Sequence, residues 1–173
     1  MKAKLFLVLL TSLFFCACGG TLTVDNSVVG NLELNRFLGD WYEIARFDHT
    51  FERGMQETKA NYALKDDGTI AVTNQGMKNG EPKTANGKAK LTDVAAVLRV
   101  SFFGPFYSDY RVMLIDEDYQ YALIGSGSDD YLWILSRTPR ISDEVKQIIL
   151  NEARRRGYDV SQLIWVEHTG NVK

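Results

Sequence analysis

The fold of this protein is decided by a stretch of alternating residues, Lys-Thr-Ala-Asn-Gly-Lys-Ala-Lys-Leu-Thr, at positions 83–92. From Ala85 to Leu91, small or apolar residues occupy every second position, and polar residues occupy the positions between them. Because successive side chains of a β-strand point to opposite faces, this period of two predicts a strand with one buried face. That face carries Ala85, Gly87 and Ala89, and such small side chains leave room in the interior.

Further strand patterns flank this stretch on both sides. Short polar connections separate them, and two of these, Asp67-Gly68 and Asn79-Gly80, are strong hairpin-turn signals. After residue 137 the period changes to that of an amphipathic helix, with Ser142 as a good N-cap. A short ninth strand, 163–166, would follow the helix. The eight earlier strands are expected at 41–47, 58–64, 69–75, 83–92, 97–103, 110–115, 121–125 and 131–137.

The strand order points to a closed barrel. Eight sequential strands would leave two unpaired edges as an open sheet, and closing the sheet removes both edges. We therefore expect an all-β protein, an eight-stranded antiparallel up-and-down β-barrel with one C-terminal α-helix and a short ninth strand. A barrel of eight strands encloses side chains or one small ligand.

The N-terminus has the composition of a bacterial lipoprotein signal peptide. Lys2 and Lys4 precede an apolar stretch, 5–15, which is too short for a spanning helix, and Ala17 stands directly before Cys18. Cleavage at this point would leave Cys18 to carry acyl chains that anchor the protein to a membrane. The absence of an aspartate after Cys18 favours the outer membrane, with the domain facing the periplasm. The alternative is that both cysteines are merely apolar residues of the signal segment.

These features divide the chain into a signal peptide at 1–17, a lipidated tether at 18–33 and a barrel domain at 34–173. The chain has two cysteines, both in the export region, so the domain is expected to have no disulfide and no cysteine nucleophile. The net charge of the full chain is −2, and such a mildly acidic protein is a poor candidate for nucleic-acid binding.

Three short motifs resemble the signatures of the lipocalin family. They are Gly39-Asp40-Trp41-Tyr42 at the first strand, Ser108-Asp109-Tyr110, which resembles the family motif between the sixth and seventh strands, and Arg137 at the end of the eighth. The longer runs 41–49, 101–107 and 131–139 look like those of the bacterial outer-membrane lipocalins. The signature residues carried over are Gly39, Trp41, Asp109, Tyr110 and Arg137.

This resemblance implies a barrel whose open end admits a small hydrophobic ligand, such as a fatty acid or a lysophospholipid. The implied role is lipid binding, storage or transport in the cell envelope, without a cofactor. Trp41 and Arg137 would form a cation–π pair at the closed end of the barrel.

Six residues are candidates for ligand contact. The loop 49–55 would lie over the barrel mouth, where Phe51 and Met55 could line the entrance and Arg53 could meet a carboxylate or phosphate. The alternative is a simple surface loop. The other candidates, on the strands, are Tyr62, Ala89 and Phe102.

Glu43 is harder to place from the sequence. Alternation from Trp41 directs Glu43 into the interior, where a carboxylate needs a partner or a raised pKa. It could meet Arg46, Arg111 or a water molecule, or a bulge could turn it outward.

Other functions have weaker support. His49 and His168 are the only histidines, and they have no metal-ligand spacing, so we expect neither a metal site nor catalytic residues. A lipid-modifying enzyme on the same fold is the alternative function, and a filled structural barrel is a third. The aromatic run at 101–107 is either barrel core or a rim of Phe103, Phe106 and Tyr107, which could favour a homodimer or membrane contact.

Overall fold

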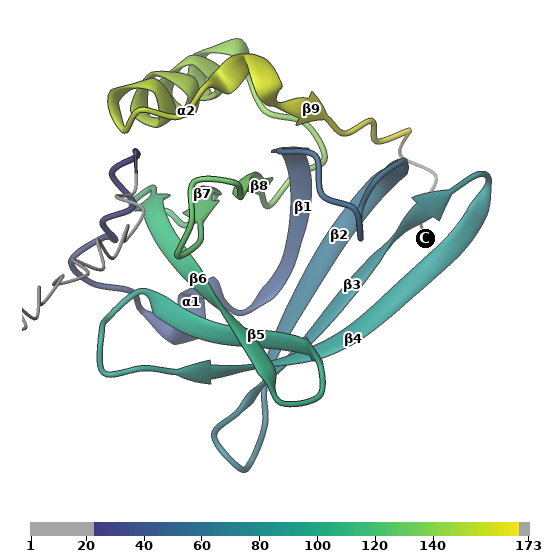
Figure 1. Ribbon diagram of the computed structural model, residues 1–173, viewed down its shortest axis with the longest axis vertical. Helices are drawn as coiled ribbons and strands as arrows, with labels where there is room; N and C mark the ends of the chain where they lie inside the picture. The colour runs from purple at the N-terminus through teal and green to yellow at the C-terminus, as the bar shows by residue number, and fades with distance from the viewer. Residues whose placement is uncertain (1–22, 170–173) are drawn as a thin grey trace, which may run out of the picture.

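The computed structural model describes residues 23–169, so the predicted signal peptide and Cys18 lie outside the described residues. Eight antiparallel strands form a closed barrel, because β1 pairs with both β2 and β8 (Figure 1). This confirms the expected fold. The strands are β1 (Gly39–Arg46), β2 (Met55–Leu64), β3 (Ile70–Lys78), β4 (Glu81–Leu91), β5 (Val97–Phe103), β6 (Phe106–Ile115), β7 (Tyr121–Gly125) and β8 (Leu132–Ser136).

Most strands differ from their predicted bounds by a few residues, and the starts of β2 and β6 differ most. β2 begins at Met55, three residues before the predicted start, and β6 begins at Phe106 instead of residue 110. The β5–β6 hairpin is therefore tight, with Phe103 paired to Phe106 and Gly104 at a φ of 55°. Glycine adopts this left-handed backbone without the strain that a side chain would add.

A short helix that the sequence did not predict, α1 (Leu34–Phe37), closes one end of the barrel. Its buried Phe37 accepts a hydrogen bond from the Trp41 indole at 2.7 Å through its carbonyl oxygen. The Arg137 guanidinium lies 3.8 Å from the centre of the Trp41 ring, as expected for the closing pair. The signature Gly39 adopts a φ of 93° at the start of β1, and a β-carbon added there would lie 3.6 Å from Arg137 Nη1.

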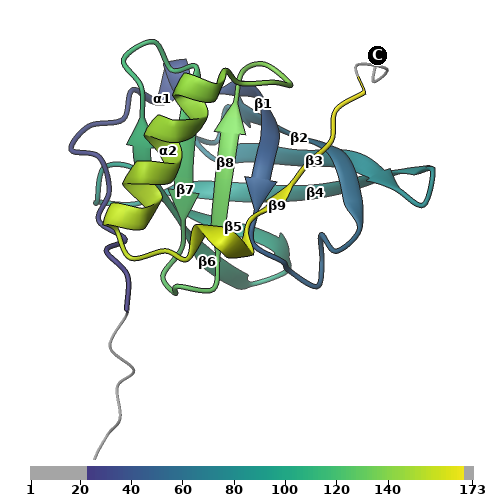
Figure 2. The same cartoon turned by 90° about the horizontal axis from the view of Figure 1, so that it is seen from above.

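The C-terminal helix, α2 (Asp143–Arg155), lies against the outside of the barrel over β7 and β8 (Figure 2). Ser142 caps it as predicted, accepting a hydrogen bond from the Val145 amide at 3.2 Å. Its apolar stripe packs on the outer surface of the barrel and forms a second core, separate from the one inside. The ninth strand, β9 (Ile164–Trp165), follows a 3₁₀ turn (Val160–Gln162) and pairs with β1. No helix within residues 23–169 is long and apolar enough to span a bilayer.

Part of the segment predicted as the tether packs on the barrel through Val24, Val28, Val29 and Leu32. The buried Arg156 donates hydrogen bonds to the carbonyl oxygens of Asp25, at 3.1 Å, and Ser27, at 2.7 Å. Val28 and Val29 pack against the interior core. Because these contacts are made with distant parts of the chain, the local sequence, which lacks a regular period, did not reveal them.

Candidate ligand-binding cavity

A cavity of about 550 Å³ occupies the barrel interior. This volume lies in the range of about 300–1,000 Å³ that is usual for small-molecule pockets. The β1–β2 loop and the β5–β6 hairpin contribute to the lining of the cavity, through residues such as Glu52 and Phe103. Most of its lining surface is apolar, with contributions from residues such as Val72, Val100 and Leu135.

Four of the six predicted contact residues line this cavity, namely Phe51, Met55, Tyr62 and Phe102. Arg53 does not, because its exposed side chain forms an ion pair with Asp48 at 2.6 Å on the surface. Ala89 does not either. It is fully buried in the packed interior core.

The small residues of β4 explain part of the cavity. Ala85 lines it, whereas a β-carbon at Gly87 would lie 2.8 Å from the Phe102 ring. The Phe102 ring therefore fills the space beside Gly87, and this glycine does not enlarge the cavity.

Two buried tyrosines face each other in the cavity. The Tyr62 hydroxyl donates a hydrogen bond to the Tyr110 hydroxyl at 2.9 Å. Burial raises the pKa of both phenols, so both remain neutral at physiological pH. The signature residue Tyr110 therefore also lines the cavity. These hydroxyls are polar groups in an otherwise apolar part of the cavity.

Glu43 forms a buried ion pair with Arg46, and this answers the question that the sequence left open. Arg46 Nη1 donates to Glu43 Oε1 at 2.6 Å, and the two side chains are only 1% and 9% exposed, respectively. Residues three apart on a regular strand face opposite sides, but the pairing of β1 with β8 shifts register between Glu43 and Ala45. This bulge lets both side chains reach the same side of the sheet. Arg111 instead pairs with Asp109 and the carbonyl of Asn26.

Glu52 is a second buried carboxylate beside this pair, and the sequence did not single it out. Its Oε2 accepts a hydrogen bond from the Trp133 indole at 3.1 Å. Arg46 Nη2 donates to the carbonyl oxygens of Glu52, at 2.8 Å, and Met55, at 2.9 Å, which fixes the end of the β1–β2 loop. Burial raises the pKa of Glu52, and burial together with the nearby Glu52 raises the pKa of Glu43 despite the Arg46 charge. We call Glu43, Arg46, Glu52 and the adjacent Thr58 the acidic cluster.

His49 belongs to an aromatic group next to the acidic cluster. Its ring lies 5.2 Å from Phe51, 4.8 Å from Tyr131 and 4.8 Å from Trp133, measured between ring centres. Burial, with the Arg46 charge nearby, lowers the pKa of His49 to about 4, so the ring is neutral at physiological pH. Within residues 23–169, no group of three or more acidic, histidine or cysteine side chains could hold a metal ion.

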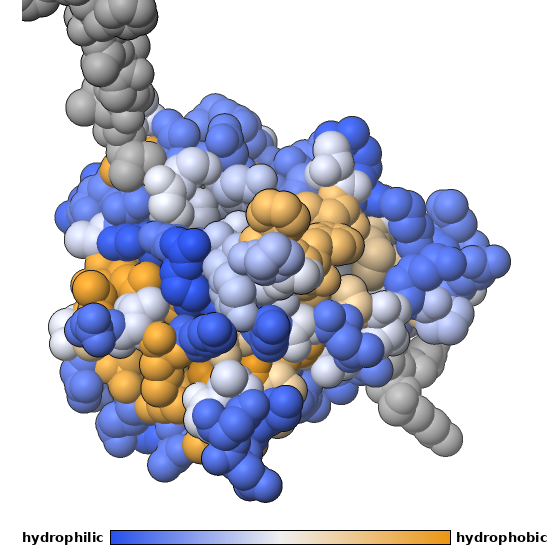
Figure 3. Space-filling model, turned by 60° about the horizontal axis from the view of Figure 1, so that its bottom comes forward, coloured by the Kyte–Doolittle hydropathy of each residue, from blue (hydrophilic) through white to orange (hydrophobic). Residues whose placement is uncertain are grey.

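The expected aromatic rim is only partly present. Figure 3 shows apolar side chains gathered in patches on the face that it presents, and the tip residues Phe103 and Phe106 are 75% and 78% exposed. Tyr107, in contrast, is half-buried, and the ammonium of Lys90 lies 5.1 Å from the centre of its ring. Phe102, on the other face of the strand, lines the cavity.

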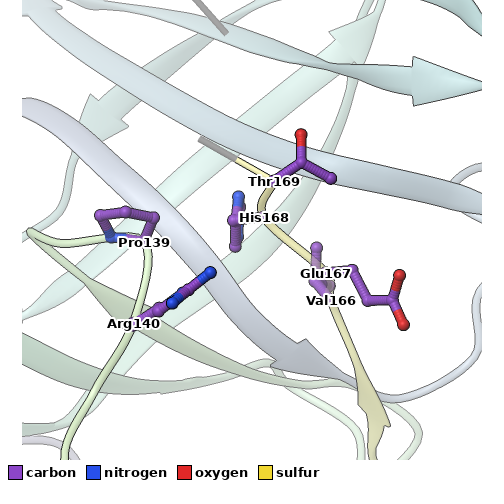
Figure 4. A pocket seen from close by; sticks show the side chains of 6 residues that line it. All are labelled: Pro139, Arg140, Val166, Glu167, His168 and Thr169. Carbon is purple, nitrogen blue, oxygen red and sulfur yellow. The ribbon is translucent and has the colours of Figure 1, made fainter. Parts of the chain in front are cut away.

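A second pocket, of about 400 Å³, lies outside the barrel between the β8–α2 connection and the C-terminal segment (Figure 4). Pro139 and Arg140 form one side, and residues 166–169 form the other. His168 Nε2 is 2.8 Å from the carbonyl oxygen of Glu43, so this ring attaches the C-terminal segment to β1. We therefore interpret this pocket as a seam between two packed segments.

Comparison with known proteins agrees with this geometry. The model of a lipocalin-like domain matches residues 32–168, which is most of the chain. The chain belongs to the lipocalin family. In this lipocalin, the Arg137 guanidinium lies over the Trp41 ring at one end of the barrel, and Tyr110 lines the cavity.

Relatives of this lipocalin are found in bacteria. It is 52% identical over 149 residues to the outer membrane lipoprotein Blc of Escherichia coli K12, covering 84% of each chain. It is 41% identical to the protein of the same name in Vibrio cholerae, covering 94% of this chain and 97% of that one. Among solved structures, insecticyanin from the tobacco hornworm superposes with a TM-score of 0.70 at 20% identity, covering 84% of this chain and 86% of that one. That last similarity concerns the fold alone.

Proposed function

We propose that this lipocalin binds single-chain lipids, such as fatty acids or lysophospholipids, in its barrel cavity. The observation that carries the proposal is the open cavity of about 550 Å³ with a mainly apolar lining. Burial of an alkyl chain there would supply most of the affinity, at about 25 cal/mol per Å² of apolar surface. The few polar groups would fix the position of the head group.

We further propose that Cys18 carries a lipid anchor that holds the barrel at the outer membrane. The sequence pattern before Cys18 supports this, as does the name outer membrane lipoprotein that its bacterial relatives carry. An anchored binder would meet its ligand at a high local concentration. A Cys18→Ala variant is expected to move from the membrane fraction to the soluble periplasmic fraction and to lose acyl-chain labelling.

We infer a binding role and not catalysis, because the histidines have structural surroundings. His49 is stacked among aromatic rings, and His168 contacts a backbone carbonyl of β1. Neither histidine contacts a serine hydroxyl in the described part of the chain. The alternative, a lipid-modifying enzyme, would require turnover of a lipid ester by the purified protein.

Titration of the delipidated protein with fatty acids and lysophospholipids tests the binding proposal. Ala60 lines the cavity, and Ala63, on the same strand, is exposed on the surface. We expect Ala60→Trp to reduce lipid affinity by at least about tenfold because the indole occupies the ligand volume, and Ala63→Trp to leave it unchanged. Equal lipid affinity of both variants, or no saturable binding by the unmodified protein, would contradict the proposal.

A further inference from the structure

The acidic cluster contains more negative than positive charge. Arg46 pairs with Glu43, and its remaining Nη2 hydrogen bonds go to backbone carbonyls. The Glu52 carboxylate accepts a bond from the Trp133 indole but has no ion-pair partner among residues 23–169. Glu52 is 8% exposed, and a buried carboxylate without a cation is unfavourable in its ionised form.

A second observation points to an absent ligand group at this position. Thr58, which is 5% exposed and lies beside Glu43, lines the cavity, and its hydroxyl has no hydrogen-bond partner at standard geometry. Buried hydroxyls in native proteins are nearly always hydrogen-bonded, so the Thr58 hydroxyl, covered beside the Glu43 carboxyl, retains capacity for a further polar partner.

Aromatic rings complete the surroundings of Glu52. Phe51, Tyr131 and Trp133 line the same cavity, and the ring centres of Tyr131 and Trp133 are 5.8 Å apart. Aromatic faces attract cations, and groups of such rings are a common way to bind quaternary ammonium groups. A buried carboxylate beside aromatic rings that line the same cavity therefore favours a positively charged ligand group, and His49 covers one side of these rings.

We propose that the acidic cluster is a subsite for the ammonium group of a cationic or zwitterionic single-chain amphiphile. Glu52 pairs with the positive charge, the rings of Trp133 and Tyr131 contact it, and the alkyl chain extends toward Tyr62 and Tyr110. This inference rests on the proposed lipid-binding function, because the chain must occupy the cavity. It adds that the head group is selected by its positive charge.

The other charged groups that line the cavity are arranged differently. Lys59 pairs with Asp40 at 3.2 Å, Lys83 pairs with Glu81 at 2.7 Å, and Asp109 pairs with Arg99 and Arg111. Lys78, on the β3 side of the lining, has no such ion pair in the described residues. The Lys78 ammonium could therefore pair with a phosphate next to the ligand's ammonium group. A zwitterionic head group has such a phosphate, whereas a purely cationic head group does not.

Ammonium binding would be coupled to proton release. Burial raises the pKa of Glu52, and a cation bound beside it favours the ionised form, so binding lowers that pKa again and expels a proton. The facing groups are Glu43 and Arg46 of β1, His49 and Glu52 of the loop, and Tyr62 of β2. His49 stays neutral above a pH of about 4. The affinity for an amphiphile with an ammonium head group, relative to an uncharged one, is therefore expected to increase as the pH rises.

Head-group selectivity can be measured with four dodecyl amphiphiles below their micelle concentrations. They are dodecyltrimethylammonium, dodecylphosphocholine, dodecanoate and dodecanol, each titrated calorimetrically into the delipidated protein. We expect the two ammonium compounds to bind about tenfold more tightly than dodecanol. The two ammonium compounds distinguish a purely cationic ligand from one that also uses its phosphate.

Glu52→Gln removes the charge and keeps an acceptor for the Trp133 indole. We expect it to abolish the ammonium advantage without changing dodecanol affinity, and we expect Glu117→Gln, an exposed carboxylate at the other end of the barrel, to have no effect. If Glu52→Gln does not fold, proton release by the unmodified protein, measured in two buffers of different ionisation enthalpy, provides the test.

The outcomes separate the two proposals. Equal affinity for all head groups, an ammonium advantage that survives in Glu52→Gln, or binding without proton release at any pH tested would overturn the ammonium subsite and leave lipid binding intact. No binding of any dodecyl compound would overturn the lipid-binding function itself, and the subsite with it.

Discussion

The guanidinium carbon of Arg137 lies 3.8 Å from the centre of the Trp41 indole ring, and the same guanidinium donates hydrogen bonds to five backbone carbonyls. One side chain thus joins α1, the start of β1 and the β6–β7 connection at the closed end. The accepting carbonyls belong to Arg36, Phe37, Leu38, Asp40 and Tyr119.

Removing this guanidinium should destabilise the barrel. We expect Arg137→Ala to lower the free energy of unfolding by about 3 kcal/mol, because it removes the cation–π contact and leaves carbonyls without a donor. Arg140→Ala, an exposed arginine on the next connection, should change it by less than about 0.5 kcal/mol. Urea denaturation measures both, and equal effects would contradict the closing role of Arg137.

Removing one partner of the Glu43–Arg46 pair should lower the free energy of unfolding more than removing both partners. Arg46→Met leaves two buried carboxylates without a cation and is expected to destabilise the protein by about 3–5 kcal/mol near pH 8. The loss should be smaller near pH 5, where protonation neutralises the carboxyls. Adding Glu43→Gln to Arg46→Met should recover part of the loss in the same denaturation assay. A double variant less stable than Arg46→Met would contradict this account.

His49 should make folding stability depend on pH. Its pKa is about 4 in the folded protein and near its ordinary value of 6.5 in the unfolded chain, so the unfolded state binds the proton more readily. The contribution of His49 to the free energy of unfolding is fully present above a pH of about 6.5, and it is lost as the pH falls toward about 4. We expect His49→Phe to reduce the slope of unfolding free energy against pH in this interval and His168→Gln to retain it. An unchanged slope in His49→Phe would be evidence against a buried neutral imidazole.

Arg156 should hold the N-terminal segment against the barrel. Its guanidinium bonds to Glu152 at 2.7 Å, to the carbonyls of Asp25 and Ser27, and to the Met113 carbonyl at 2.8 Å. We expect Arg156→Ala to increase amide hydrogen exchange of residues 24–29 strongly, because it removes the guanidinium that donates to the carbonyls of Asp25 and Ser27. Arg154→Ala, an exposed neighbour on α2, should leave exchange of this segment unchanged. If residues 24–29 stayed protected from exchange in Arg156→Ala, the apolar contacts of Val28 and Val29 would be enough to hold the segment on the barrel.

The sequence by itself determined the barrel, because strand periodicity and turn residues are local properties. The alternation at 83–92, the turn pairs and the Ser142 cap each act within a few residues, and closure follows from the need to pair strand edges. The motif around Trp41 and the distant Arg137 also predicted the closing pair, and four candidate residues line the cavity.

Only the tertiary structure decided the chemistry of the cavity wall. The β1 bulge brings Arg46 to the same side as Glu43, and the β1–β2 loop folds Glu52 against Trp133, a residue 81 positions away in the chain. A bulge has no reliable local signature, and the burial of a loop carboxylate depends on partners that are remote in sequence. Arg53 and Glu52 are adjacent charged residues of one loop, yet one is a surface ion-pair partner and the other a buried carboxylate in the cavity. That difference arises from packing and its effect on solvation, which the order of residues does not contain.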